Sequence, residues 1–158
     1  MDKSPESYQW LVIFLLHMVI VLLLSQLNQT LATVSLFLFI NGLLVTFPAL
    51  FLPFGQGIVA VILLSIFYDS GESWDIGTSL IPYLITFVII YYTRPRIRYQ
   101  EKNVFKSVVL VANLALFVYY TVLAGTRFGT SSSFVLLNLT HLVFSQLVLY
   151  IFSGWFQS

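Results

Sequence analysis

The sequence predicts an all-α fold: a polytopic membrane helix bundle with six transmembrane helices, in a single integral membrane domain covering residues 1–158. Hydrophobic residues make up 59% of the chain and charged residues only 8%, against about 45–50% and about 25% in an average soluble domain. So few charges cannot cover the apolar surface of a soluble fold, whereas lipid accepts that surface. Continuous apolar runs recur along the chain, and lipid offers their backbone no partner, so they must be helical.

The first three spans are divided by polar and turn-forming residues. Residues 8–25 form the first predicted span, and the polar stretch 26–30 ends it. Residues 31–52 form the second span. The sequence Pro-Phe-Gly-Gln-Gly at 53–57 is a strong turn signal. The third span, residues 58–68, is short, so we expect it to extend to Phe54 at one end and to Asp69 at the other.

The last three spans are separated by a basic loop and by a small-residue loop. Residues 78–93 form the fourth span, with Pro82 in its first turns, where a proline is best tolerated. Residues 104–123 form the fifth span, 125–133 the last break, and 134–156 the sixth span. Because the third span is short and the second contains Pro48, five spans plus a re-entrant segment is the alternative architecture.

Positive charge is concentrated between the fourth and fifth spans. Five of the seven basic residues lie there: Arg94, Arg96, Arg98, Lys102 and Lys106. Short loops rich in Lys and Arg remain on the cytoplasmic side of a membrane. With six crossings, both termini are then cytoplasmic and the acidic loop 69–75 is outside. The basic loop also suits anionic headgroups, so membrane lipid is one expected partner.

The chain shows no set of residues that would make it an enzyme, and we expect no cofactor. It contains no cysteine, which excludes disulfides, thiolate metal sites and a cysteine nucleophile. It also lacks the basic tract or RNA-binding signature that would indicate nucleic acid. A metal site is not expected either, because the acidic residues between the third and fourth spans lack the spacing of a calcium loop.

That acidic loop contains Asp69, Glu72 and Asp75. Their carboxylates could bind a hard cation, but a solvated outer loop is the simpler interpretation. Asp69 differs because it closes the third span, and we expect it to accept hydrogen bonds from the free backbone donors that start the fourth span. Gly71 and Gly77 would let the loop turn tightly.

Polar residues inside the last span share one helix face. Asn138 lies three residues before His141, and Ser145 lies four after it. One interpretation is a polar pocket or proton site, because intramembrane ionisable groups are often functional. The favoured one is a stripe of hydrogen bonds between helices that holds the bundle together. His17 is alone on an apolar helix, so we expect a packing role for it.

Three further interior positions suggest helix contacts. Asn41 and Gly42 lie in the second span, and Asn113 lies in the fifth. Gly42 would allow close approach of another helix, because it has no side chain.

Residues 48–83 carry a resemblance to a known family. Pro-Ala-Leu-Phe-Leu-Pro-Phe-Gly-Gln-Gly at 48–57 leads into an apolar span that ends in Asp69. Gly71 and Ile-Gly-Thr-Ser-Leu-Ile-Pro-Tyr at 76–83 follow. This order resembles MreD, the small membrane protein of the bacterial rod-shape system, in which a glycine-entered span ends in aspartate before a glycine-containing turn.

The resemblance to MreD implies a function and partners. The function is that of a non-enzymatic inner-membrane scaffold of the elongasome, involved in cell-shape maintenance and lateral peptidoglycan synthesis. The implied partners are MreC and, through MreC, MreB and the wall-synthesis enzymes. The implied location is the bacterial inner membrane, crossed several times.

An alternative follows from architecture. MreD is similar to the substrate-binding membrane subunits of energy-coupling-factor vitamin transporters, which are also six-span proteins of this size. In that reading Trp74, Asp75 and Asn28 would be the ligand contacts. Against it, residues 10–24 show no small-xxx-small pattern for docking a coupling subunit.

Overall fold

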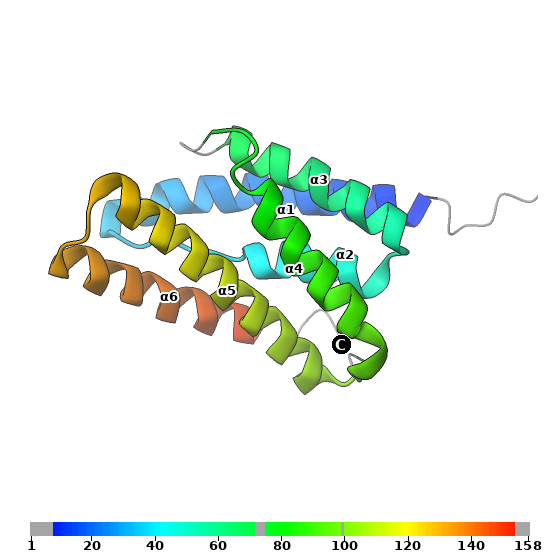
Figure 1. The fold of residues 1–158 in the computed structure, drawn as a ribbon. Coiled ribbons are helices and arrows are strands. Elements are labelled where there is room, and N and C mark those ends of the chain that lie inside the picture. Colours follow the sequence, from blue (N-terminus) through cyan, green and yellow to red (C-terminus); the bar gives the residue numbers. More distant parts are fainter. Residues whose placement is uncertain (1–7, 72–74, 99, 154–158) are drawn as a thin grey trace, which may run out of the picture. The chain divides into compact units, whose positions relative to one another are not determined.

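The computed structural model describes residues 8–71, 75–98 and 100–153 (Figure 1). All regular structure in these ranges is helical, which confirms the all-α part of the predicted fold class for them. The α-helices are α1 (Gln9–Leu31), α2 (Asn41–Phe51), α3 (Phe54–Ser70), α4 (Leu80–Thr93), α5 (Lys102–Phe128) and α6 (Ser132–Ser153). Two short 3-10 helices, η2 (Ala32–Val34) and η3 (Arg94–Arg96), follow α1 and α4.

Three stretches of the described chain are long and apolar enough to cross a bilayer, judged by length and composition: Trp10–Val34, Asn103–Phe128 and Ser132–Ser153. These three helices fit a membrane protein. Helices α2 and α3 are apolar but have only 11 and 17 residues, fewer than the ~20 that span a hydrocarbon core. Six full spans therefore stay a prediction.

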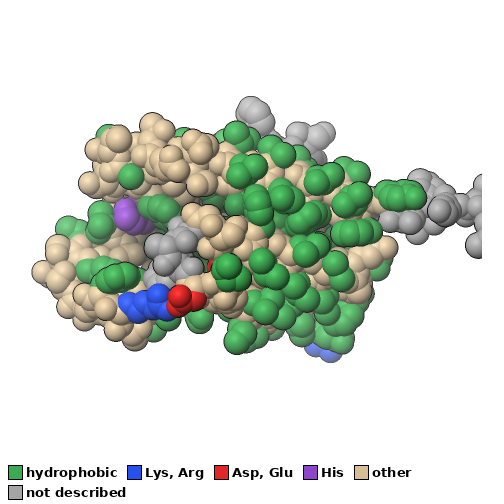
Figure 2. All heavy atoms as spheres, turned by 90° about the horizontal axis from the view of Figure 1, so that it is seen from above, with side chains coloured by type: hydrophobic (Ala, Val, Ile, Leu, Met, Phe, Trp, Pro, Cys, Tyr) green, Lys and Arg blue, Asp and Glu red, His purple; other side chains and the backbone are tan. Residues whose placement is uncertain are grey.

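The surface agrees with a lipid environment. Figure 2 shows hydrophobic side chains over much of the face that it draws and charged side chains at only a few points. Large apolar residues such as Ile81 and Leu136 are 66% and 68% exposed. Water would penalise so much contiguous apolar surface, and lipid does not.

The chain divides into two compact units. The first takes the described residues of Met1–Ser25 and Leu44–Ile97, and within it α3 packs against α4. The second takes those of Gln26–Leu43 and Arg98–Ser158, and within it α5 and α6 run antiparallel side by side (Figure 1).

In the first unit, α3 and α4 form a closely packed hairpin. The expected extension of the third span to Phe54 and Asp69 is confirmed, because α3 includes both. A Cβ built on Gly57 would lie 2.6 Å from Cε2 of Phe87, so the ring of α4 occupies the space where a side chain would be. Near the other end, the rings of Tyr68 and Tyr83 have centroids 6.1 Å apart.

Two of the predicted breaks are wrong in extent. Helix α1 continues through the polar stretch 26–30 to Leu31, and the hydroxyl of Thr30 donates to the carbonyl of Gln26 at 3.3 Å. A polar side chain that bonds its own helix in this way does not end it. The break predicted at 125–133 shortens to 129–131, because α5 continues to Phe128 and the chain turns only at Gly129, with φ 81°.

The second predicted span is wrong as a single helix. Residues 31–52 instead contain the end of α1, η2, a non-helical segment at 35–40 and the 11-residue α2. The 3-10 helix η2, which continues from α1, ends through a Schellman cap at Ser35, which has a left-handed φ of 56°. Leu36 N–H donates to the carbonyl of Leu31 at 3.0 Å, and Ser35 N–H donates to that of Ala32 at 3.1 Å.

Candidate functional site

Residues 36–40 belong to the second unit and form no helix, and Figure 1 draws them as an extended link to α2. Leu38 and Phe39 are only 6% and 3% exposed. Irregular backbone at membrane depth is tolerated only where protein buries it and supplies partners for its N–H and C=O groups. The partners of this segment therefore define a polar site inside the second unit.

Asn28 of α1 bonds both backbone groups of one residue. Its Oδ1 accepts from Leu38 N–H at 2.8 Å, and its Nδ2 donates to the Leu38 carbonyl at 3.0 Å. A side-chain amide presents a donor and an acceptor side by side, as a neighbouring β-strand does. Asn28 thus takes the place of a strand partner for the extended segment.

Asn113 of α5 joins the segment to the first turn of α2. Its Oδ1 accepts from Gly42 N–H at 3.0 Å, and its Nδ2 donates to the Phe39 carbonyl at 3.0 Å. The expected close approach at Gly42 is confirmed, because a Cβ built there would lie 2.5 Å from Cα of Asn113. Asn113 itself is fully buried.

Helix α6 supplies the remaining bonds. The hydroxyl of Ser145 accepts from Phe39 N–H at 2.9 Å and donates to the Phe37 carbonyl at 3.5 Å. Nε2 of His141 lies 3.2 Å from the Ser35 carbonyl, which only accepts, so that nitrogen carries the proton. We call Asn28, Asn113, His141 and Ser145 the backbone clasp.

The polar face predicted on the last span is therefore divided in its contacts. His141 and Ser145 bond the backbone of residues 35–39, which is outside their own helix, whereas the favoured interpretation expected bonds to another helix. Asn138 does not join them, because its Nδ2 donates to the Phe134 carbonyl of α6 at 2.9 Å. His17 likewise bonds its own helix, with Nδ1 2.6 Å from the Ile13 carbonyl, and its ring packs 5.6 Å from that of Phe47.

Asn41 is the exception among the buried amides. It begins α2 with an exposed fraction of 0%, and neither its side-chain nitrogen nor its oxygen has a hydrogen-bond partner among the residues that the structure describes. A buried amide without partners is destabilising, so this side chain invites a direct test.

In the first unit, Asp69 links the end of α3 to the start of α4. Its Oδ2 accepts from Gly77 N–H at 2.8 Å and from Ser79 N–H at 3.0 Å, and its Oδ1 accepts from the Ser79 hydroxyl. Asp69 is 1% exposed. The link expected from the sequence is confirmed, because these donors precede the first turn of α4.

The two loop glycines differ in their backbone. Gly77 has φ 97°, a left-handed conformation that favours glycine. Gly71 has φ −94°, which other residues adopt readily, so the expectation that both glycines are needed for the turn is met only at Gly77.

Of the residues proposed for ligand or cation binding, the structure describes Asp69, Asp75 and Asn28. Glu72 and Trp74 lie outside the described residues, and Asp75 is exposed. Between residues 8 and 153, wherever the structure describes them, no group of three or more His, Cys, Asp or Glu is placed to hold a metal ion. Both amide groups of Asn28 are already bonded to Leu38.

The basic residues occupy both units. In the first, Nη1 of Arg94 donates to the Leu52 carbonyl at 3.2 Å, and its guanidinium lies 5.9 Å from the Tyr91 ring centre. Arg96, in η3, is exposed. The bond from Arg94 to the Leu52 carbonyl connects the end of α4 to the link between α2 and α3.

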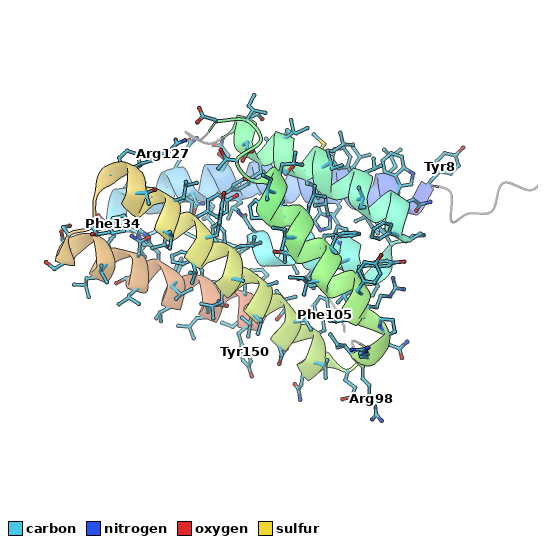
Figure 3. The ribbon with its side chains drawn as sticks, in the orientation of Figure 1. Tyr8, Arg98, Phe105, Arg127, Phe134 and Tyr150 are labelled. Atoms are coloured by element: carbon cyan, nitrogen blue, oxygen red, sulfur yellow. The ribbon has the colours of Figure 1, made fainter. Side chains whose placement is uncertain are left out.

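In the second unit, Arg98 forms an exposed ion pair with Glu101 at 3.6 Å. Lys102 begins α5, and the Nζ of Lys106 lies 4.8 Å from the ring centre of Tyr150. Figure 3 shows Arg98 and Arg127 at opposite ends of α5. A span of α5 across the membrane would therefore place these two arginines on opposite sides.

No protein-family model, no curated protein and no solved structure matches this chain. Its function is therefore argued from its own geometry.

Proposed function

We propose that the chain is a non-enzymatic scaffold of the MreD type, which acts in a bacterial inner membrane by docking partner helices. The observation that carries the proposal is the use of its interior polar side chains. The chain's own backbone is the hydrogen-bond partner of Asn28, Asn113 and Ser145. Asp69 also bonds backbone N–H groups, and in addition it accepts a bond from the Ser79 hydroxyl. Groups engaged in this way stabilise a shape and leave little polar capacity for chemistry or for a solute.

The packing of the α3–α4 hairpin supports the same proposal. From Phe54 onward, the residues behind the resemblance to MreD lie in this hairpin, where Gly57 admits the Phe87 ring and Asp69 bonds the residues before α4. Their roles are those of packing and helix connection. A protein that presents fixed helix faces in lipid associates through close van der Waals fit and a few polar bonds.

In this proposal the partners are MreC and, through it, MreB and the wall-synthesis enzymes. Both termini and the basic residues from Arg94 to Lys106 are cytoplasmic, and the acidic loop is outside. The vitamin-transporter alternative is disfavoured by one contact, because a ligand at Asn28 would have to break two hydrogen bonds to Leu38.

Depletion and co-purification test the proposal. Depletion in the rod-shaped host should give round cells, and the tagged protein should co-purify with MreC from membranes. In depleted cells, Asn113→Leu, which removes one member of the clasp, should fail to restore the rod shape and should not co-purify with MreC. Gly55→Ala should do both, because no atom lies within 4 Å of a Cβ at Gly55. A growth requirement for a vitamin with unchanged cell shape, or purification with a bound vitamin and without MreC, would exclude the scaffold.

A further inference from the structure

An apolar groove lies on the surface of α5 and α6 in the second unit. Leu110, Val111 and Leu114 line it from α5, and Val143, Leu147 and Tyr150 line it from α6. Its volume is about 540 Å³. The one polar lining residue, Gln146, turns its Nε2 to the Leu110 carbonyl at 3.2 Å, so that donor does not interrupt the apolar surface.

A positive charge stands at one end of this groove. Lys106 lies one helical turn before Leu110 on the same face of α5, and its Nζ is 4.8 Å from the Tyr150 ring centre. Tyr150 is 56% exposed and projects from α6 (Figure 3). Among the described residues, the ion pair of the basic loop joins Arg98 to Glu101. Within the same residues, Lys106 contacts the ring of Tyr150 and forms no ion pair with a carboxylate. The end of the groove therefore attracts an anion.

The length of the groove discriminates between possible occupants. The lining residues of α6 run from Leu142 to Tyr150, and eight residues of helix rise about 12 Å. Half of a hydrocarbon core measures ~15 Å, whereas a transmembrane helix would need a groove along ~30 Å. An acyl chain of a single leaflet matches this length, and a partner helix does not.

We infer that the groove binds an anionic phospholipid from the leaflet next to the basic loop. Its phosphate lies at Lys106 and one acyl chain follows Leu110, Leu114 and Val143. The cytoplasmic leaflet supplies such lipids, and basic pockets at helix ends on that side suit their headgroups. The site is independent of the scaffold function, because it needs only the α5–α6 pair and a membrane.

Native mass spectrometry of the full chain tests the site. The protein is released from nanodiscs that contain equal amounts of dioleoylphosphatidylglycerol and dioleoylphosphatidylcholine, and the retained lipid is counted. Wild type should retain one phosphatidylglycerol. Lys106→Gln should lower the preference for phosphatidylglycerol about fivefold. Val143→Trp, which fills the groove, should abolish retention of both lipids.

Two control variants distinguish a defined lipid-binding site from general electrostatic attraction between the protein and anionic lipids. Arg98→Gln removes a cation whose side chain is 87% exposed and which does not line the groove, so the lipid preference should remain. Leu136→Trp places the same indole side chain on α6 away from the groove, and retention should remain. Equal losses in Lys106→Gln and Arg98→Gln would overturn the site in favour of diffuse surface charge. A wild-type dimer that Val143→Trp dissociates would overturn it in favour of a second copy of the chain.

Discussion

Replacing Gly42 by alanine adds one Cβ where the first turn of α2 meets α5. That atom would lie 2.5 Å from both Cα and Cβ of Asn113, where real Cβ atoms essentially never come closer than 3.0 Å. The backbone of one helix must therefore move. Movement of Asn113 also weakens its bonds to Gly42 N–H and to the Phe39 carbonyl, each 3.0 Å long.

The size of the effect follows from three terms: the overpacking, the weakened hydrogen bonds and the helix propensity of alanine. Overpacking a tight contact costs about 1–3 kcal/mol. Two hydrogen bonds inside a membrane protein contribute on average about 0.6 kcal/mol each. The better helix propensity of alanine returns at most ~1 kcal/mol. Gly42→Ala should therefore destabilise the second unit by about 1–3 kcal/mol.

Unfolding in mixed micelles of mild detergent and dodecyl sulfate measures this change, with Gly55→Ala as the matched variant. Gly55 lies in the first turn of α3 and has no atom within 4 Å of an added Cβ, so its replacement should be neutral or slightly stabilising. If the two variants unfold at the same dodecyl sulfate fraction, the close contact at Gly42 does not exist in the membrane protein.

Three other predictions concern single positions. Asp69→Asn keeps one side-chain oxygen that can accept from the Gly77 and Ser79 N–H groups, and its amide nitrogen can donate to the Ser79 hydroxyl, so it should shift the unfolding midpoint little. Asp69→Leu should lower the midpoint clearly, because the Gly77 and Ser79 donors lose their acceptor; equal effects would argue against the link. Asn41→Leu should be neutral or stabilising in the same assay, and a loss of stability would reveal a bond that this amide makes. A membrane-impermeant thiol reagent on spheroplasts should label Ile76→Cys and not Arg98→Cys, and the reverse pattern would invert the orientation.

Arguments from short stretches of sequence predicted the bounds of α3 and the link at Asp69 in the first unit. The extension of α3 to Phe54 and Asp69 follows from the length that a span needs, and the bonds to Asp69 follow from the donors that every helix start leaves free. Both arguments use residues close together in the sequence.

The backbone clasp could not be predicted in the same way. Residues 31–52 are apolar whether they form a helix or a buried extended segment, so their composition does not discriminate. The partners that decide between the two are remote, since Ser145 lies 106 residues from Phe39 and Asn113 lies 71 from Gly42. The sequence showed single polar residues within apolar runs, which indicates buried hydrogen bonds. It did not show which backbone groups these residues bond, because that depends on the three-dimensional fold.

The amide character of the clasp leads to the last prediction. Asn113 needs both a donor and an acceptor, because it serves the Gly42 N–H and the Phe39 carbonyl together. Asn113→Asp preserves the shape and the acceptor, but it turns a carboxylate oxygen toward the Phe39 carbonyl and buries a charge at a position that is 0% exposed. An uncompensated buried charge costs about 3–5 kcal/mol.

Asn138→Asp is the control, because that amide is half-buried and bonds only its own helix. We therefore expect Asn113→Asp at pH 7 to lower the unfolding midpoint far more than Asn138→Asp does. The difference should shrink as the pH falls, because a buried carboxyl protonates at a higher pH than an exposed one and the protonated group can again donate to Phe39. Comparable midpoints for both variants at neutral pH would show that residues 36–40 do not depend on the clasp.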